Sequence, residues 1–183
     1  MTPLRKALPI ILALGFPAVS FAASANVTTA LLHILERKGL PAAEAQATTQ
    51  TATQQYHGVA LMAILGSLKG IPALPSQYYS TPGTLKIPVA TGLSQILTSA
   101  FTQRFSATQV KNAYTAYTHA VTQGAPPKPT QRLLVAAIKK GVAGPKLKAL
   151  AASYIAKLRS GISANQAAQR ANGDLFRYGD YGL

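Results

Sequence analysis

The fold class is decided near the middle of the chain, where residues 106–123 read SATQVKNAYTAYTHAVTQ. The stretch opens with Ser106-Ala107-Thr108-Gln109, an S-x-x-Q capping box in which the serine and the glutamine side chains each satisfy one backbone amide of the first helical turn. Apolar residues then recur at helical spacing, at Val110, Ala113, Tyr114, Tyr117 and Val121. The pattern predicts an amphipathic helix over residues 107–123 with one buried face.

Similar signals for the start and the end of a helix recur along the chain. A second S-x-x-Q box spans residues 163–166, and three segments share the order cation, variable residue, glycine, apolar residue, then a small residue or proline: residues 37–41, 139–143 and 159–163. Glycine suits the left-handed position after a helix, and a cation complements the helix C-terminus. A further apolar stripe follows Pro145, at Leu147, Leu150, Ala151, Tyr154 and Leu158. The sequence therefore predicts an all-α bundle of about six short helices arranged as helical hairpins.

One segment does not fit the helical pattern. Residues 69–91 are rich in proline, glycine and tyrosine, which predicts a long loop, with room for a short hairpin. Long loops in compact domains are often functional. Tyr78 and Tyr79 are therefore candidate partner contacts, although a tyrosine pair that fixes the loop to the helical body is the more ordinary interpretation.

The first 22 residues have the three parts of a secretory signal peptide. Arg5 and Lys6 precede an apolar run, residues 7–19, which small residues follow. The run is shorter than the roughly 20 apolar residues of a membrane span. Cleavage is expected after Ala22, with Ala25 as the alternative, so we expect a periplasmic or secreted protein with a helical domain at residues 23–172 and a separate tail at residues 173–183.

The charge balance is strongly basic. The chain has 18 lysines and arginines against 4 acidic residues, a formal charge of +14, and no acidic residue lies between Glu44 and Asp174. Such a surface attracts polyanions. Adaptation to an acidic exterior explains the same composition, because a fold with few carboxylates loses few favourable interactions when they are protonated.

Two groups of residues are candidates for binding. The first is a cation-rich stretch without acids, which predicts a basic amphipathic surface for an anionic polymer or an anionic membrane: Arg132, Lys139, Lys140, Lys146, Lys148, Lys157 and Arg159. Solvated lysines that cover the edge of the core are the simpler interpretation. The second is the aromatic and acidic tail, which is a flexible end, a segment that docks on the basic body, or a site for a partner protein: Phe176, Tyr178 and Tyr181, with Asp174 and Asp180.

Catalytic and cofactor motifs are scarce. The chain has no cysteine, which excludes thiol nucleophiles, thiolate zinc sites and covalent c-type haem. His33, His57 and His119 lack metal-binding spacing, and no G-x-S-x-G or phosphate-binding loop is present. We therefore expect no cofactor and no metal. The leading hypothesis is an exported, non-catalytic binding or envelope-associated protein; a peripheral membrane binder, a structural protein adapted to acid and a histidine-based hydrolase are the alternatives.

Overall fold

The computed structural model describes the backbone of residues 19–179 and the side chains of residues 25–175. Most of the predicted signal peptide lies outside this range. Within it the chain forms eight α-helices, one 3₁₀ turn and two short strands: α1 (Val19–Arg37), α2 (Ala42–Gln55), α3 (Gly58–Lys69), η1 (Ser76–Tyr78), β1 (Tyr79–Thr81), β2 (Thr84–Leu85), α4 (Ile87–Thr102), α5 (Ala107–Thr122), α6 (Pro127–Lys139), α7 (Pro145–Arg159) and α8 (Ala164–Gly179).

The all-α prediction is confirmed, with eight helices in the described residues where about six were expected. Two helix breaks are weakly marked in the sequence. Only Tyr56 and His57 separate α2 from α3, and α4 ends before Arg104, which has a left-handed φ of 52° although it is not glycine.

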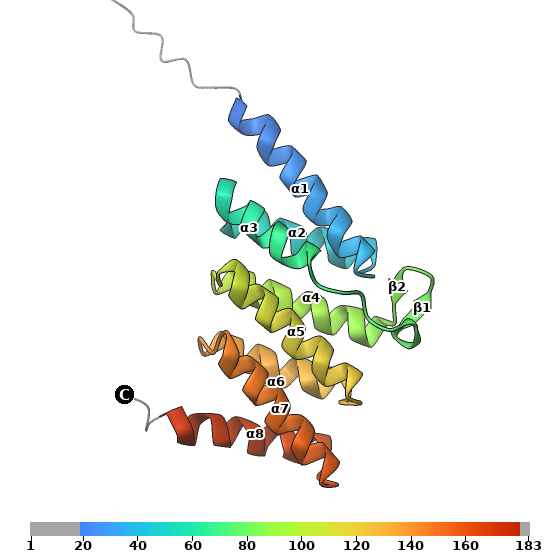
Figure 1. Ribbon diagram of the computed structural model, residues 1–183, viewed down its shortest axis with the longest axis vertical. Helices are drawn as coiled ribbons and strands as arrows, with labels where there is room; N and C mark the ends of the chain where they lie inside the picture. Colours follow the sequence, from blue (N-terminus) through green and yellow to red (C-terminus); the bar gives the residue numbers. More distant parts are fainter. Residues whose placement is uncertain (1–18, 180–183) are drawn as a thin grey trace, which may run out of the picture.

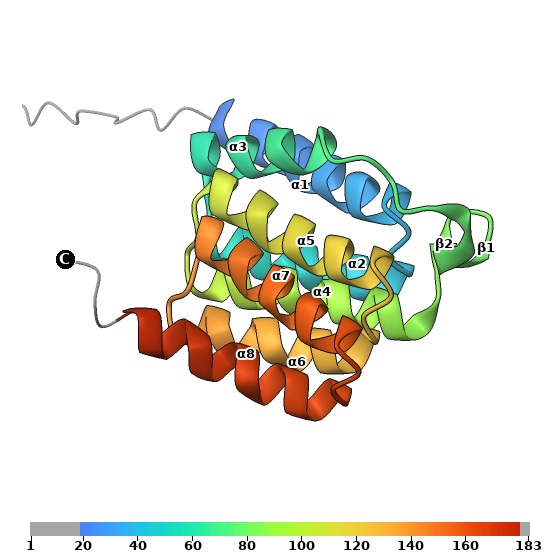
Figure 2. The same cartoon turned by 60° about the horizontal axis from the view of Figure 1, so that its bottom comes forward.

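The helices stack as hairpins in two layers (Figure 1). α3, α5 and α7 lie side by side in one layer, and α2, α4 and α6 lie side by side in the other (Figure 2). The chain forms three successive hairpins, of which α4–α5 and α6–α7 pack directly, whereas α2 and α3 of the first hairpin pack mainly on α4, α5 and α1. At one end of the stack α1 packs on both α2 and α3, and at the other end α8 packs on both α6 and α7. The core lies between the two layers and α1 and α8 cover its ends.

The predicted helix stops are present. Gly39, Gly141 and Gly161 all have positive φ, between 80° and 92°. After α6 the amide of Val142 donates to the carbonyl of Ala137 (3.0 Å), and the amide of Gly141 donates to that of Ile138 (2.8 Å), which is the Schellman pattern. These stops set the tight turns that let each helix fold back on its predecessor.

The predicted α5 is the centre of the core. Its capping box forms, with the Ser106 amide donating to Gln109 Oε1 (2.8 Å) and the Gln109 amide donating to Ser106 Oγ (3.3 Å), and its apolar stripe is buried. The Tyr117 hydroxyl donates to the Val89 carbonyl (3.2 Å) and lies against Gly92 on α4; a Cβ at residue 92 would fall 2.0 Å from that oxygen. This close approach sets how near α4 and α5 can pack.

The loop between α3 and α4 is shorter than predicted. It ends at Lys86 rather than near residue 91, because α4 begins at Ile87 and takes Pro88 into its first turn. A proline there loses no helical hydrogen bond, so its presence does not exclude a helix. The short hairpin is present as the antiparallel pair β1 and β2.

The N-terminal helix α1 starts at Val19 and continues through both predicted cleavage positions. Its first buried side chain in the described range is Leu31, with Val27 partly buried. Removal of residues 1–22 would thus leave the described contacts of α1 with the core in place. Among the helices of residues 19–179, none combines the length and the apolar character that crossing a membrane requires.

Candidate anion-binding edge

Three turns line up along one edge of the stack, which we call the turn edge: residues 56–57, 103–106 and 140–144 (Figure 1, left). The other turns, with β1 and β2, lie at the opposite edge in both views of the ribbon (Figures 1 and 2). The arrangement follows from the hairpins, because every second connection returns to the same side.

The turn edge gathers cations from separate parts of the sequence. Its basic residues are all exposed: Arg104, Lys139, Lys140, Lys146 and Lys148. Neither the three turns nor the helix ends that meet there, residues 51–61, 99–110 and 136–148, contain any Asp or Glu. No carboxylate within these three segments therefore offsets their positive charge, but Lys140 has an interaction partner and the end of α8 lies at the same side of the stack (Figure 1).

Helix dipoles add to this positive potential. The N-termini of α3, α5 and α7 all point to the turn edge, and each N-terminus has a partial positive charge. α7 begins after Gly144 without a side-chain cap and has Lys146 in its first turn, where an acidic residue is favourable and a lysine is not. Lys139, in the last turn of α6, suits its dipole and needs no functional explanation. Lys146 has no such structural reason.

The structure divides the seven predicted cations. Lys139, Lys140 and Lys146 lie on the helix ends beside the turn 140–144, and Lys148, in the first turns of α7, lines a pocket with Thr115 and His119 of α5. Lys157 and Arg159 lie at the far end of α7, a helix of 15 residues or about 22 Å. Nζ of Lys157 is 2.7 Å from Oδ2 of Asp174, and Arg159 donates to the side chain of Gln123, the residue directly after α5. These two cations therefore have partners within the fold, and Lys140 at the turn edge has an interaction partner as well.

Arg132 lies apart from both groups. It lines a shallow groove between α6 and α8, of about 400 Å³, together with Asn165, Gln169 and Asn172. The Oδ1 atom of Asn172 is buried and has no hydrogen-bond partner among the described residues. The groove contains one cation, so it is a separate feature from the turn edge.

The predicted aromatic contacts are only partly described. Tyr78 and Tyr79 are half-buried, and the Tyr78 hydroxyl donates to the Val121 carbonyl (3.0 Å), which fixes the loop to the helical body. α8 continues through Gly173 to Gly179, so residues 173–179 are helical. The side chains of Phe176 and Tyr178, and all of Tyr181, lie outside the described residues.

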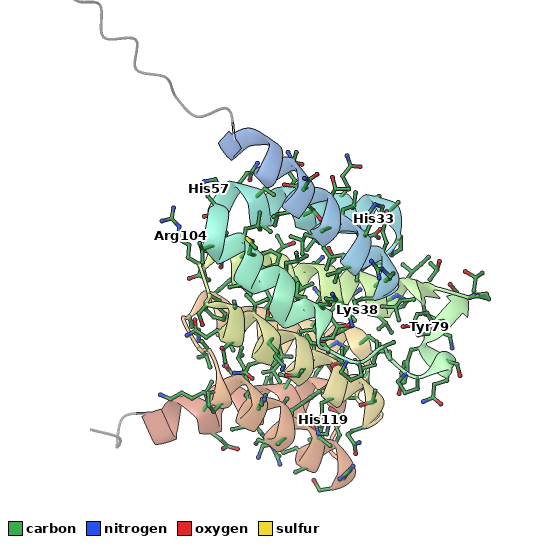
Figure 3. All side chains as sticks on the ribbon, turned by 45° about the horizontal axis from the view of Figure 1, so that its top comes forward. His33, Lys38, His57, Tyr79, Arg104 and His119 are labelled. Atoms are coloured by element: carbon green, nitrogen blue, oxygen red, sulfur yellow. The ribbon has the colours of Figure 1, made fainter. Side chains whose placement is uncertain are left out.

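The histidines do not meet in a common site. His33 is on α1, His57 precedes α3 and His119 is on α5 (Figure 3). Nδ1 of His33 is 3.2 Å from Oε2 of Glu36, in an exposed pair. Within the part of the chain that the structure describes, no three His, Asp or Glu side chains are close enough together to bind a metal ion.

Sequence reasoning missed one exposed feature, the outer face of α3. Val59 is 84% exposed and Met62 is 58% exposed. A signal was available, because the helix sequence GVALMAILGSLK has no polar side. The same helix ends beside Lys38, which donates to the Ile71 carbonyl and whose pKa is lowered by burial.

Comparisons with protein-family models, with curated proteins and with solved structures found no match for this chain. Its function is therefore argued from its own residues.

Proposed function

We propose that this chain is a non-catalytic binding protein that holds an anionic partner at the turn edge, outside the cytoplasm. The observation that supports the proposal best is the placement of Lys146 and Lys148 at the N-terminal end of α7, which follows the turn after Lys139. Cations at a helix N-terminus oppose the helix dipole, so an anion that neutralises them would relieve this repulsion. The extracytoplasmic location rests on the predicted signal peptide.

A polyanion or a dense array of phosphate groups suits this edge better than a single small anion. The cations come from two successive turns and are exposed, so each can contact a different charged group of the partner. Binding of this kind releases counterions and weakens as salt increases. The partner is thus defined by repeated negative charge rather than by a pocket.

Adaptation to an acidic exterior is the second candidate, and one observation favours it. Glu36, Glu44 and Asp174, the acidic residues with described side chains, are all partly exposed and none is buried in the core. Protonation would then break only surface pairs, such as Asp174 with Lys157. This candidate predicts no preference of an anion for either edge.

The test compares two triple variants with the same change in charge. One is Lys139→Gln, Lys146→Gln and Lys148→Gln at the turn edge; the control is Arg37→Gln, Lys86→Gln and Lys128→Gln, exposed cations near the opposite edge. Binding to double-stranded DNA, as a polyanion probe, is measured over a salt titration. We expect the turn-edge variant to lower the slope of log K against log salt by up to about 2.7, at about 0.9 for each phosphate that is no longer neutralised, and the control variant to lower it much less. Equal effects of the two variants would contradict the proposal and support general basicity.

A further inference from the structure

α3 is apolar on the side that faces solvent as well as on the side that faces the core. Leu61, Ile64 and Leu68 are buried, whereas the opposite face exposes apolar side chains and one glycine at helical spacing: Val59, Met62, Ala63 and Gly66. A surface helix of a globular protein normally carries polar residues there. An exposed apolar stripe of this kind indicates a surface that another apolar phase covers.

Cations flank this stripe at both ends. Val59 lies in the first turn of α3, at the turn edge, where Nε of Arg104 donates to Gln55 Oε1 (3.3 Å) and His57 lies nearby (Figure 3). Lys69 occupies the last turn of α3. Neither α3 nor its neighbour α5 contains an acidic residue; the nearest described acid in the packed elements is Glu36, near the end of α1 and close to His33.

We infer that the anionic partner is a lipid bilayer, with Val59 and Met62 inserted among the lipids and the lysines of the turn edge on the phosphate headgroups. The inference rests on the proposed function and names its partner. Apolar side chains beside cations are what binding to an anionic membrane surface requires, and Val59 belongs to both features. A polymer such as nucleic acid, bound through its phosphates, would leave the apolar stripe exposed to water.

A second copy of the chain is a poorer fit to the same face. In a two-fold dimer through α3, Arg104 and Lys69 would be brought near the cations of the other copy, which is unfavourable. The stripe offers four residues, whereas a stable protein interface uses roughly 20 to 30 residues a side. A bilayer needs neither shape complementarity nor a large contact area on the protein.

The first experiment measures sedimentation of the mature chain with vesicles of phosphatidylcholine mixed with phosphatidylglycerol, and with pure phosphatidylcholine. The variant is Val59→Ser with Met62→Ser, and the control is Ile87→Ser, a side chain 75% exposed at the start of α4 near the opposite edge. We expect the double variant to lose at least about a hundredfold in affinity for the anionic vesicles, since each of the two inserted apolar side chains contributes about tenfold or more. It should bind DNA like the wild type, and Ile87→Ser should change neither affinity.

The outcomes separate the two claims. If the wild type binds DNA but not anionic vesicles, the bilayer is the wrong partner and the proposed function stands. If the double variant binds vesicles like the wild type, Val59 and Met62 are not inserted, so the inference fails while the proposed function stands. If the wild type binds neither probe in a salt-dependent way, the proposed function itself fails. Equal losses from Ile87→Ser and the double variant would also overturn the bilayer assignment.

A second measurement does not depend on affinity. The chain has no cysteine, so Met62→Cys gives a single site for an environment-sensitive fluorophore, with Ile87→Cys as the matched control. Addition of anionic vesicles should shift the emission of the probe at residue 62 toward that of an apolar medium and leave the probe at residue 87 unchanged. A shift at residue 87 alone would overturn the orientation that we infer.

Discussion

Lys146 links stability and binding in a way that one substitution can test. It is the second residue of α7, after Pro145, in a first turn with no acidic residue and beside the exposed Lys148. A lysine there opposes the helix dipole by about 0.3 to 1 kcal/mol, and a glutamate at the same position would gain a similar amount. Lys146→Glu should therefore increase the free energy of unfolding by about 0.6 to 2 kcal/mol while it weakens binding of any anion at the turn edge.

Thermal unfolding followed by circular dichroism, at low salt, measures the first effect. For a domain of this size the gain corresponds to a rise in melting temperature of roughly 1 to 8 °C, and it should shrink as salt is added. The control is Lys69→Glu, in the last turn of α3, where a glutamate meets the negative end of the dipole and should lower the melting temperature. A decrease for Lys146→Glu, or equal shifts for both variants, would refute the reasoning from helix ends.

Two further predictions concern the core. Gly92→Ala should lower the free energy of unfolding by about 1 to 3 kcal/mol in urea titrations, because the clash with Tyr117 outweighs the gain in helix propensity. The control, Gly66→Ala, adds a methyl group in open space on α3 and should raise the free energy of unfolding by up to about 1 kcal/mol. A Gly92→Ala variant more stable than the wild type would contradict the packing of Tyr117 on Gly92. Burial raises the pKa of Tyr56 to about 12 and also raises the pKa values of Tyr114 and Tyr117. The neutral tyrosines therefore contribute fully to the free energy of unfolding below about pH 10, and this contribution should be lost as the pH rises toward their pKa values in the folded protein. Urea unfolding on either side of about pH 10 checks this, and equal stability at both pH values would contradict it.

Much of the fold could be predicted because the sequence marks most helix ends chemically. The capping box at Ser106 and the glycines at residues 39, 141 and 161 gave the correct positions of helix ends. Arg104 shows where such reasoning fails. Arg104 ends α4 in the same way as the glycines end their helices, with a positive φ and with the Phe105 amide donating to the Ala100 carbonyl (3.0 Å). Unlike glycine, however, an arginine in the sequence does not indicate a positive φ. Packing of Phe105 and Tyr56 in the core, rather than local preference, holds that turn.

The site was harder to predict than the fold. The excess of basic residues is visible in the composition, but the grouping of those residues depends on which turns share an edge. Lys139 ends α6 at the turn edge, whereas Lys157 lies near the opposite end of the next helix, α7. Arg104 belongs to another hairpin and yet lies at the turn edge. The distances between these cations depend on how the hairpins pack, which no local sequence pattern indicates.

The stacking of hairpins has a consequence for how such a surface could change during evolution. Each hairpin packs mainly on its immediate neighbours and contributes one turn to the same edge, as the α4–α5 and α6–α7 hairpins do. Duplication or loss of one hairpin would thus lengthen or shorten the edge by one turn with its own cations, while the contacts of the remaining hairpins stay as they are. The length of the turn edge that contacts an anionic partner would then depend on the number of hairpins rather than on the sequence of any single hairpin.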